Sequence, residues 1–271
     1  MSMRPSHPAP WVVRVYKTAR ILVHLLEGVA TTALLFPLLR PPSQRSLIRL
    51  WSRRLLRMLN IDARVHGAFS TPDGKILLVA NHVSWLDIFI LNSVHPVRFV
   101  AKAELARWPV IGRMLRRVGT LFVERARKRD TRRVNHGARE AIAKGDIVAV
   151  FPEGHTTDGT GVGTFKSSLL QPIIDLNGHV LPVAIRYRAV SGEISVLPAY
   201  VGKLTLLASL WRITAARSLI ADLHVALPLP ATSVHRRDLA LSAERAIRAF
   251  VAPPAAVMEP EIPGDPTVAA L

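Results

Sequence analysis

Residues 75–87, Lys-Ile-Leu-Leu-Val-Ala-Asn-His-Val-Ser-Trp-Leu-Asp, decide the fold class, because they join a strand pattern to a helix pattern through a short polar bend. The apolar run 76–80 has the length and residue types of a buried strand. Ser84 is predicted to cap the helix that follows, which puts Asp87 at the third helical position, as in a capping box. A strand that leads into a capped helix is typical of an α/β domain.

The same bend decides whether His82 and Asp87 can meet. On one continuous helix, side chains five residues apart point about 140° away from each other. If the helix begins at Ser84, His82 lies before it, and a carboxylate at the third helical position reaches back toward the cap. We therefore expect Asp87 to accept a hydrogen bond from one imidazole nitrogen and to leave the other nitrogen free as a base.

The rest of the chain alternates strand and helix patterns from residue 62 to about 228, and a final helix pattern follows. The predicted strands are 63–66, 75–80, 97–102, 121–124, 147–151, 180–187, 194–197 and 223–226. The predicted helices are 84–93, 108–117, 130–144, 167–176, 204–217 and 238–251. This alternation predicts an α/β fold with a mixed, largely parallel sheet flanked by helices.

Composition limits the class of partner. The 271 residues carry a formal net charge of +17, and 49% of them are hydrophobic. A chain that is both apolar and basic suits an anionic membrane surface, nucleic acid or acidic small molecules. Aromatic residues make up only 6% and are not interleaved with basic residues, so nucleic acid is the weaker interpretation. The chain has no cysteine, which excludes disulfides, thiolate catalysis and cysteine metal sites.

Two helix patterns precede the α/β domain. Residues 11–39 are apolar, with one polar stripe formed by Lys17, Arg20, His24, Glu27 and Thr31. The stripe favours a helix that lies in the membrane interface or packs on another helix, over the alternatives of a spanning helix and a buried soluble one. Residues 43–59 combine an arginine at every fourth position with leucines and a tryptophan, which suits an anionic bilayer surface.

These patterns predict four segments. Residues 1–10 are disordered, 11–60 form a membrane-docking two-helix unit, 61–251 form the α/β domain, and 252–271 form a disordered tail rich in Pro and Ala. Deletion of residues 1–60 is expected to weaken membrane association and to leave the α/β domain able to fold.

Several groups of polar residues follow the predicted strand ends, where ligands bind in α/β sheets. In chain order they are Asn81-His82-x-Ser84-x-x-Asp87, Ala101-Lys102-Ala103-Glu104-Leu105, Gly119-x-x-Phe122-Val123-x-Arg125 and Phe151-Pro152-Glu153-Gly154, and a fifth group, Leu181-Pro182-Val183, lies within the predicted strand 180–187. Each group alone is explained as solvated charges or turn glycines. Their recurrence at successive strand ends of one domain points to a common site.

Four of these groups resemble, in the same order along the chain, the sequence blocks of the glycerolipid acyltransferase family, which comprises the 1-acylglycerol-3-phosphate acyltransferases and their relatives. The group around Lys102 is not one of these blocks. The resemblance implies that His82 is the general base for the acceptor hydroxyl and that Asp87 orients it. Supporting roles are implied for Asn81, Ser84, Phe151 and Pro152. Binding of the acceptor, including its phosphate or other anionic head group, is implied for Lys102, Arg125, Glu153 and Gly154.

The resemblance also implies the partners and the location. The co-substrate would be acyl-CoA or acyl carrier protein, the acceptor a lysolipid, and the location the cytoplasmic face of the inner or plasma membrane, on an anionic surface. No cofactor, metal or nucleic acid is implied, and His155 near Asp158 is too sparse a ligand set for a metal site.

The third block departs from the family's pattern. That block often continues with Thr and then Arg, whereas His155 and Thr156 follow Gly154 here, so one plausible phosphate ligand is missing. The segment from Thr157 to Ser168 is similar both to bacterial members that acylate lysophosphatidate and to those that act on lyso-ornithine lipid.

Three functions therefore stay open. We expect transfer of a fatty acyl group to lysophosphatidate, giving phosphatidate in phospholipid biosynthesis, with O-acylation of lyso-ornithine lipid or another lysolipid as the alternative. A non-catalytic, anion-binding protein of the membrane surface is the alternative of another class, in which His82 only helps to begin a helix. A hydrolase ranks third because the chain has no nucleophile elbow.

Overall fold

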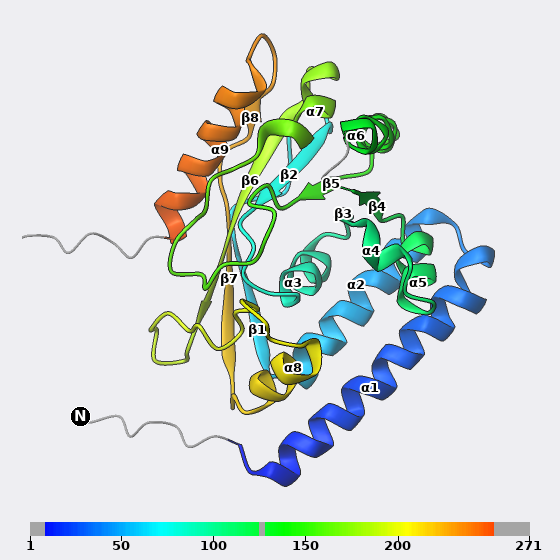
Figure 1. The fold of residues 1–271 in the computed structure, drawn as a ribbon, viewed down its shortest axis with the longest axis vertical. Coiled ribbons are helices and arrows are strands. Elements are labelled where there is room, and N and C mark those ends of the chain that lie inside the picture. Colours follow the sequence, from blue (N-terminus) through cyan, green and yellow to red (C-terminus); the bar gives the residue numbers. More distant parts are fainter. Residues whose placement is uncertain (1–8, 125–127, 252–271) are drawn as a thin grey trace, which may run out of the picture.

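A computed structural model describes residues 9–124 and 128–251, in which helices cover both faces of one sheet (Figure 1). The strands are β1 Ile61–His66, β2 Ile76–Ala80, β3 Arg98–Lys102, β4 Leu121–Val123, β5 Val148–Val150, β6 His179–Arg188, β7 Leu219–Val225 and β8 Leu229–Pro230. Their order is β1-β7-β6-β2-β5-β3-β4, with β8 beside β6. Among these strands the antiparallel pairs are β6 with β7 and β6 with β8, and the other pairs are parallel. The predicted mixed, largely parallel sheet is confirmed.

The helices form two layers on this sheet. One apolar cluster joins the sheet to α2 Pro41–Met58, α3 Leu86–Val94 and α8 Leu206–Thr214, and α1 Trp11–Leu34 reaches it through Ile21. The short α5 Ile111–Arg117 contacts α1, the short α4 Ala103–Ala106 packs beside α5, and the turn η1 Phe36–Leu38 joins α1 to α2 (Figure 1). A second cluster joins the other face to α6 Lys128–Ala143, α7 Gln171–Asp175 and α9 Arg236–Val251, beside the turn η2 Ser167–Leu169.

Three of the predicted elements need correction. Residues 194–197 form no strand, since only Ile194 bridges to β6 and Pro198 has no N–H to extend a ladder. The predicted helix 167–176 is divided into η2 and α7 at Leu170, where the proline at 172 begins a new helix. The predicted disorder of residues 1–10 extends too far, because Ala9 is buried and its N–H donates to the carbonyl of Ala215 at 3.0 Å. Residues 252–271, predicted to be disordered, lie outside the described residues.

Helix α2 belongs to the core of the α/β domain. Leu55, Leu56, Met58 and Leu59 are at most 8% exposed and pack in the same cluster as α3 and the sheet. The segment before residue 60 is therefore not separate from the α/β domain, because α2 is part of the core of that domain. Periodicity identified the apolar face of this helix correctly, but the face packs on protein.

The arginine stripe of α2 also makes contacts within the domain. Arg45 pairs with Asp146 at 3.0 Å, and Arg53 donates from Nε to the carbonyl of Ser93 at 2.7 Å. These contacts tie α2 to the end of α3 and to the segment before β5. At least part of the stripe is therefore used to attach the helix, rather than left free for a membrane.

Helix α1 turns part of its polar stripe, Lys17 and His24, toward the protein, while Arg20 of the same stripe is exposed. The buried Lys17 donates to the carbonyl of Ala216 at 3.3 Å, and the buried His24 donates to the carbonyl of Trp51 at 3.0 Å. The exposed face carries Trp11, Val12, Val15, Tyr16, Leu22, Val23, Leu26 and Leu34. A soluble surface helix usually exposes its polar side instead, so α1 leaves an apolar surface exposed on the protein. By length and composition alone, residues 11–38 could also cross a membrane.

Candidate active site

The candidate site lies where the parallel strands β2, β5 and β3 end together. β5 pairs in parallel with both β2 and β3, so their carboxyl ends meet at one edge of the sheet. This edge carries His82 after β2, Lys102 at the end of β3 and the segment from Phe151 to Gly154 after β5. Arg125, which follows β4, lies outside the described residues. The topology thus brings three of the predicted groups to one place.

His82 and Asp87 form the predicted contact, with His82 Nδ1 at 2.8 Å from Asp87 Oδ2. The same carboxylate oxygen accepts from the backbone N–H groups of Val83 at 2.8 Å and Ser84 at 2.9 Å. The helix begins at Leu86, two residues later than predicted, so the N-cap residue is Trp85 rather than Ser84, and Asp87 is the second helical residue rather than the third. The Ser84 hydroxyl accepts from the Leu86 N–H at 3.3 Å. The carboxylate therefore reaches back across the bend as the capping argument requires.

Asp87 is completely buried and is compensated by four hydrogen-bond donors. The fourth is the hydroxyl of Tyr187 on β6, which donates to Oδ1 at 2.7 Å. Burial raises the pKa of Tyr187 well above its usual value, and the negative charge of Asp87 adds to this shift. Tyr187 therefore stays protonated and remains a donor. Sequence reasoning missed this residue, which was only the last position of a predicted strand.

We expect Tyr187→Phe to lower the free energy of unfolding by about 1.5–3 kcal/mol, because it leaves one oxygen of a buried carboxylate without a donor. The turnover number should fall less than in a variant without Asp87, since the contact between Asp87 and His82 remains. Thermal or denaturant unfolding, together with kcat, measures both effects. An unchanged unfolding free energy would show that the hydroxyl contributes nothing to holding the carboxylate.

The second nitrogen of the His82 imidazole is available to a substrate. The ring stacks on Phe151 with 4.0 Å between centroids, and the side chain is 20% exposed. Within residues 9–124 and 128–251, Nε2 has no hydrogen-bond partner. A neutral imidazole that donates from Nδ1 to a carboxylate presents an unprotonated Nε2, which is the form of a general base.

Buried polar side chains hold the end of β2 in place. Asn81 donates from Nδ2 to the carbonyl of Ile185 at 2.9 Å and accepts from the N–H of Ile185 at 2.7 Å. Glu153 accepts from the backbone N–H of His82 at 2.8 Å and from that of Gly163 at 2.9 Å. Both side chains therefore position the backbone on which the imidazole is mounted.

Glu153 is 1% exposed, and this burial raises its pKa, while the two N–H donors act in the opposite direction. Both of its carboxylate oxygens face backbone groups in this structure. Gly154 follows with a φ of +84°, a conformation that favours glycine. Lys102 is exposed, and its side chain has no hydrogen-bond partner in the described part of the chain. Acceptor binding by Lys102, Arg125, Glu153 and Gly154 stays a prediction.

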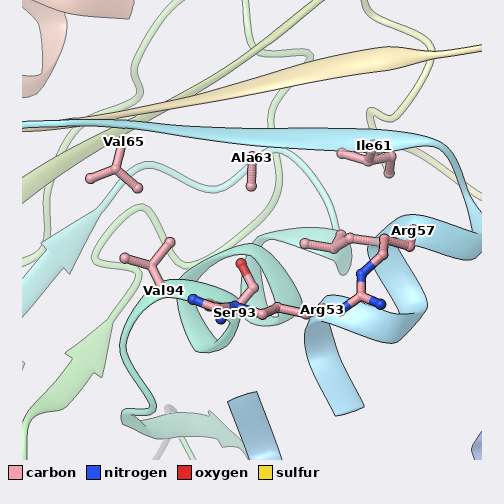
Figure 2. Close-up of a pocket in the computed structure, with 8 residues that line it drawn as sticks. Arg53, Arg57, Ile61, Ala63, Val65, Ser93 and Val94 are labelled. Atoms are coloured by element: carbon pink, nitrogen blue, oxygen red, sulfur yellow. The ribbon is translucent and has the colours of Figure 1, made fainter. Parts of the chain in front are cut away.

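A cavity of about 280 Å³ lies elsewhere, between α2, the end of α3 and the edge strand β1 (Figure 2). Arg53 and Arg57 of α2 and Ser93 and Val94 of α3 contribute to its wall opposite β1. Its lining contains none of the predicted site residues. In the described residues, no group of three or more His, Asp or Glu side chains is placed to hold a metal ion.

Comparison with known proteins agrees with this geometry. The model of the family described as Acyltransferase matches residues 62–186. The 1-acyl-sn-glycerol-3-phosphate acyltransferase of Neisseria meningitidis serogroup B is 37% identical over 213 residues, which cover 78% of this chain and 83% of that protein. The lyso-ornithine lipid O-acyltransferase of Pseudomonas aeruginosa is 34% identical over 207 residues, covering 76% and 79% respectively.

A solved structure shows the same fold. The crystal structure of the 1-acyl-sn-glycerophosphate acyltransferase from Thermotoga maritima superposes with a TM-score of 0.67 at 23% identity, covering 89% of this chain and 94% of that one. The matched residues 62–186 contain the His82–Asp87 pair and the strand ends around it. The chain therefore belongs to the glycerolipid acyltransferase family, together with the 1-acyl-sn-glycerol-3-phosphate and lyso-ornithine lipid acyltransferases.

Proposed function

We propose that this acyltransferase moves a fatty acyl group from an acyl thioester to the hydroxyl of a lysolipid, and that lysophosphatidate is the acceptor. The observation that carries the proposal is the buried Asp87 carboxylate on Nδ1 of His82, which leaves Nε2 open at the strand ends. The matched acyltransferase relatives support the same reaction.

In the proposed reaction, His82 Nε2 takes the proton of the acceptor hydroxyl as that oxygen attacks the thioester carbonyl. A carbon–oxygen bond forms, the carbon–sulfur bond breaks, and the departing thiolate receives the proton from the imidazolium. Asp87 holds the imidazole in the required tautomer and stabilises its positive charge while the proton is on it. The products are an ester and a free thiol, and the protein forms no covalent intermediate.

Two classes of acceptor occur among the matched relatives. Relatives named for lysophosphatidate and for lyso-ornithine lipid match at 37% and 34% identity, so identity does not separate them. A phosphate acceptor is supported by Lys102, an exposed cation at the end of β3, and by the predicted role of Arg125. Acyl-CoA and acyl carrier protein are both anionic, and both suit a chain with a net charge of +17. The apolar face of α1 suits action at a membrane, and we propose its cytoplasmic face.

The proposal is tested with purified full-length protein, radiolabelled acyl-CoA or acyl carrier protein, and a panel of lysolipids in mixed vesicles. We expect labelled phosphatidate from lysophosphatidate, with one thiol released per ester formed. Faster acylation of lyso-ornithine lipid would move the protein to the alternative acceptor. If no lysolipid is acylated and no thiol is released, the non-catalytic, anion-binding function is favoured instead.

Replacement of Arg125 tests whether this residue binds the phosphate of lysophosphatidate. If this residue binds the acceptor phosphate, Arg125→Ala should lower kcat/KM for lysophosphatidate by about tenfold or more, since charged hydrogen bonds contribute about 1.5–3 kcal/mol. The loss with a zwitterionic acceptor should be smaller. Steady-state kinetics on both acceptors measures the difference, and equal losses would argue against a phosphate-binding role.

A further inference from the structure

Three aromatic rings lie in nearly parallel planes at the candidate site. The imidazole of His82 stacks on Phe151, with 4.0 Å between the ring centroids and 12° between the planes. Phe151 stacks in turn on Phe99, with 5.9 Å between the centroids and again 12° between the planes. The stack therefore connects Phe99 to the proposed base through Phe151.

The order of the strands brings these rings together. β5 lies between β2 and β3, and the three strands are parallel (Figure 1). Phe99 on β3 is the register partner of Ala149 on β5, so the two side chains lie on one face of the sheet. Phe151 comes two residues after Ala149 and belongs to the same apolar cluster. His82 follows β2, on the other side of β5, so the stack runs across three neighbouring strands.

Two contacts together determine the direction of Nε2 on the His82 imidazole. The hydrogen bond between Nδ1 and Asp87, at 2.8 Å, holds one edge of the ring but allows the ring to turn about that bond. The face of Phe151 opposes this rotation, because a turned imidazole would drive its edge into the phenyl ring. The stack therefore supplies the restraint that the hydrogen bond lacks.

Phe99 is more firmly attached to the sheet than Phe151 is. Phe151 is the first residue after β5 and lies outside the strand, whereas Phe99 lies inside β3, at a position that is paired with β5. Both rings are buried, at 9% and 7% exposure respectively. A ring that the sheet holds in place thus supports the ring that contacts the imidazole.

The alternative is that Phe99 only fills the core. Phe36 in η1 shows what that role requires, since it is 4% exposed and has no ring contact in the described residues. A core-filling role predicts that loss of either ring lowers stability and leaves turnover unchanged. A positioning role predicts that loss of Phe99 also lowers turnover.

From these observations we propose that Phe99 is a positioning residue of the acyl transfer, which acts on the general base His82 through Phe151. The proposal rests on the proposed function, in which Nε2 of His82 takes the proton of the acceptor hydroxyl. Phe99 keeps the Phe151 ring in the plane that supports the imidazole. Nε2 then stays in the direction from which it can reach that proton.

The kinetic test uses the full-length protein with Phe99→Leu, Phe151→Leu, both substitutions together and, as a matched control, Phe36→Leu. Rates are measured below the unfolding temperature of every variant. We expect Phe99→Leu to lower kcat by about tenfold with KM for the lysolipid nearly unchanged, because a misdirected base slows the reaction without weakening binding. Phe151→Leu should lower kcat by about 10²-fold, and Phe36→Leu should keep the wild-type kcat.

The double variant tests whether Phe99 acts through Phe151. Once Phe151 has lost its ring, removal of the Phe99 ring has nothing left to disturb. The kcat of the double variant should therefore equal that of Phe151→Leu, rather than fall by the product of the two losses. If Phe99→Leu does not fold, Phe99→Met takes its place, since methionine keeps more of the volume but has no ring.

A spectroscopic measurement follows the imidazole directly. The NMR signal of the proton on Cε1 of His82 is assigned by its absence from His82→Ala. In the wild type it should be shifted upfield, because an aromatic ring shields a proton that is held over its face. Phe99→Leu should move this signal toward the position of an unstacked histidine, and Phe36→Leu should leave it in place.

Three results would overturn the proposal. They are a kcat of Phe99→Leu equal to that of Phe36→Leu, losses that multiply in the double variant, and a His82 signal that Phe99→Leu does not move. The kinetic results require an active wild type, so they are distinct from failure of the proposed function, in which the wild type acylates no lysolipid.

Discussion

Replacement of His82 by alanine is expected to lower kcat by about 10²–10⁴-fold, the contribution of a positioned general base. In the described residues Nε2 of this imidazole is unpartnered and lies at the strand ends, where an acceptor hydroxyl can reach it. The fold should persist, because Asp87 keeps the donors from Val83, Ser84 and Tyr187. Acyl-transfer kinetics and circular dichroism of the same preparation measure the two effects.

Asp87→Asn is the matched variant for this prediction. An asparagine still offers an oxygen to His82 Nδ1, but the imidazolium loses its negative partner, so we expect a large loss of kcat that does not exceed that of His82→Ala. The two losses should not add, since both substitutions disable one proton-transfer unit. If His82→Ala retains wild-type activity, the base is another group; if it unfolds, His82 has the structural role that the non-catalytic function assigns to it.

Deletion of residues 1–60 is expected to abolish cooperative folding. This deletion removes Leu55, Leu56, Met58 and Leu59 from the main apolar cluster. Truncation of one such side chain to alanine costs about 2–5 kcal/mol, and losing all four reaches the roughly 5–15 kcal/mol that stabilises a whole domain. Denaturant unfolding followed by circular dichroism measures the outcome. This prediction replaces the one made from the sequence, in which the α/β domain folds without residues 1–60.

A shorter deletion, of residues 1–39, is the control. It removes α1 but keeps α2, and from the described part of the main cluster it takes the buried Ile21 and the partly buried Leu25 that packs against it. We expect this variant to fold with reduced stability and to bind anionic vesicles more weakly, because the exposed apolar face of α1 is gone. A cooperatively folded 1–60 deletion would show that α2 is dispensable to the core. Undiminished vesicle binding by the shorter deletion would exclude α1 as the principal membrane contact.

The contact between His82 and Asp87 could be predicted because it is local. Five residues and one bend determine it, and a shift of the helix start from 84 to 86 did not alter it. Tyr187 could not be predicted in the same way, since it meets Asp87 only through the register between β2 and β6. The buried position of the Glu153 side chain could not be predicted either, because it depends on hydrogen bonds from the backbone N–H groups of His82 and Gly163, and backbone groups leave no pattern in the sequence.

The wrong prediction for α2, that its apolar face docks on a membrane, has one physical cause. Hydrophobic periodicity identifies an apolar face, but it does not say whether protein or lipid covers that face. The apolar face of α2 packs against the core of the α/β domain, whereas the apolar face of α1 is exposed. The polar stripe of α1, with His24 stacked on Trp51, forms part of the contact between the two helices.

The loop from Gly154 to Gly163 is bonded to His82 at two points, which limits how such a protein can evolve. Glu153 bridges the His82 and Gly163 N–H groups, and the carbonyl of His82 accepts from the Thr157 N–H at 2.7 Å. An insertion or deletion within this span would displace one of these partners and move the base with it. New acceptor preferences are therefore expected to arise by substitution at exposed positions of this loop, such as His155 and Thr160, while the length of the loop is retained.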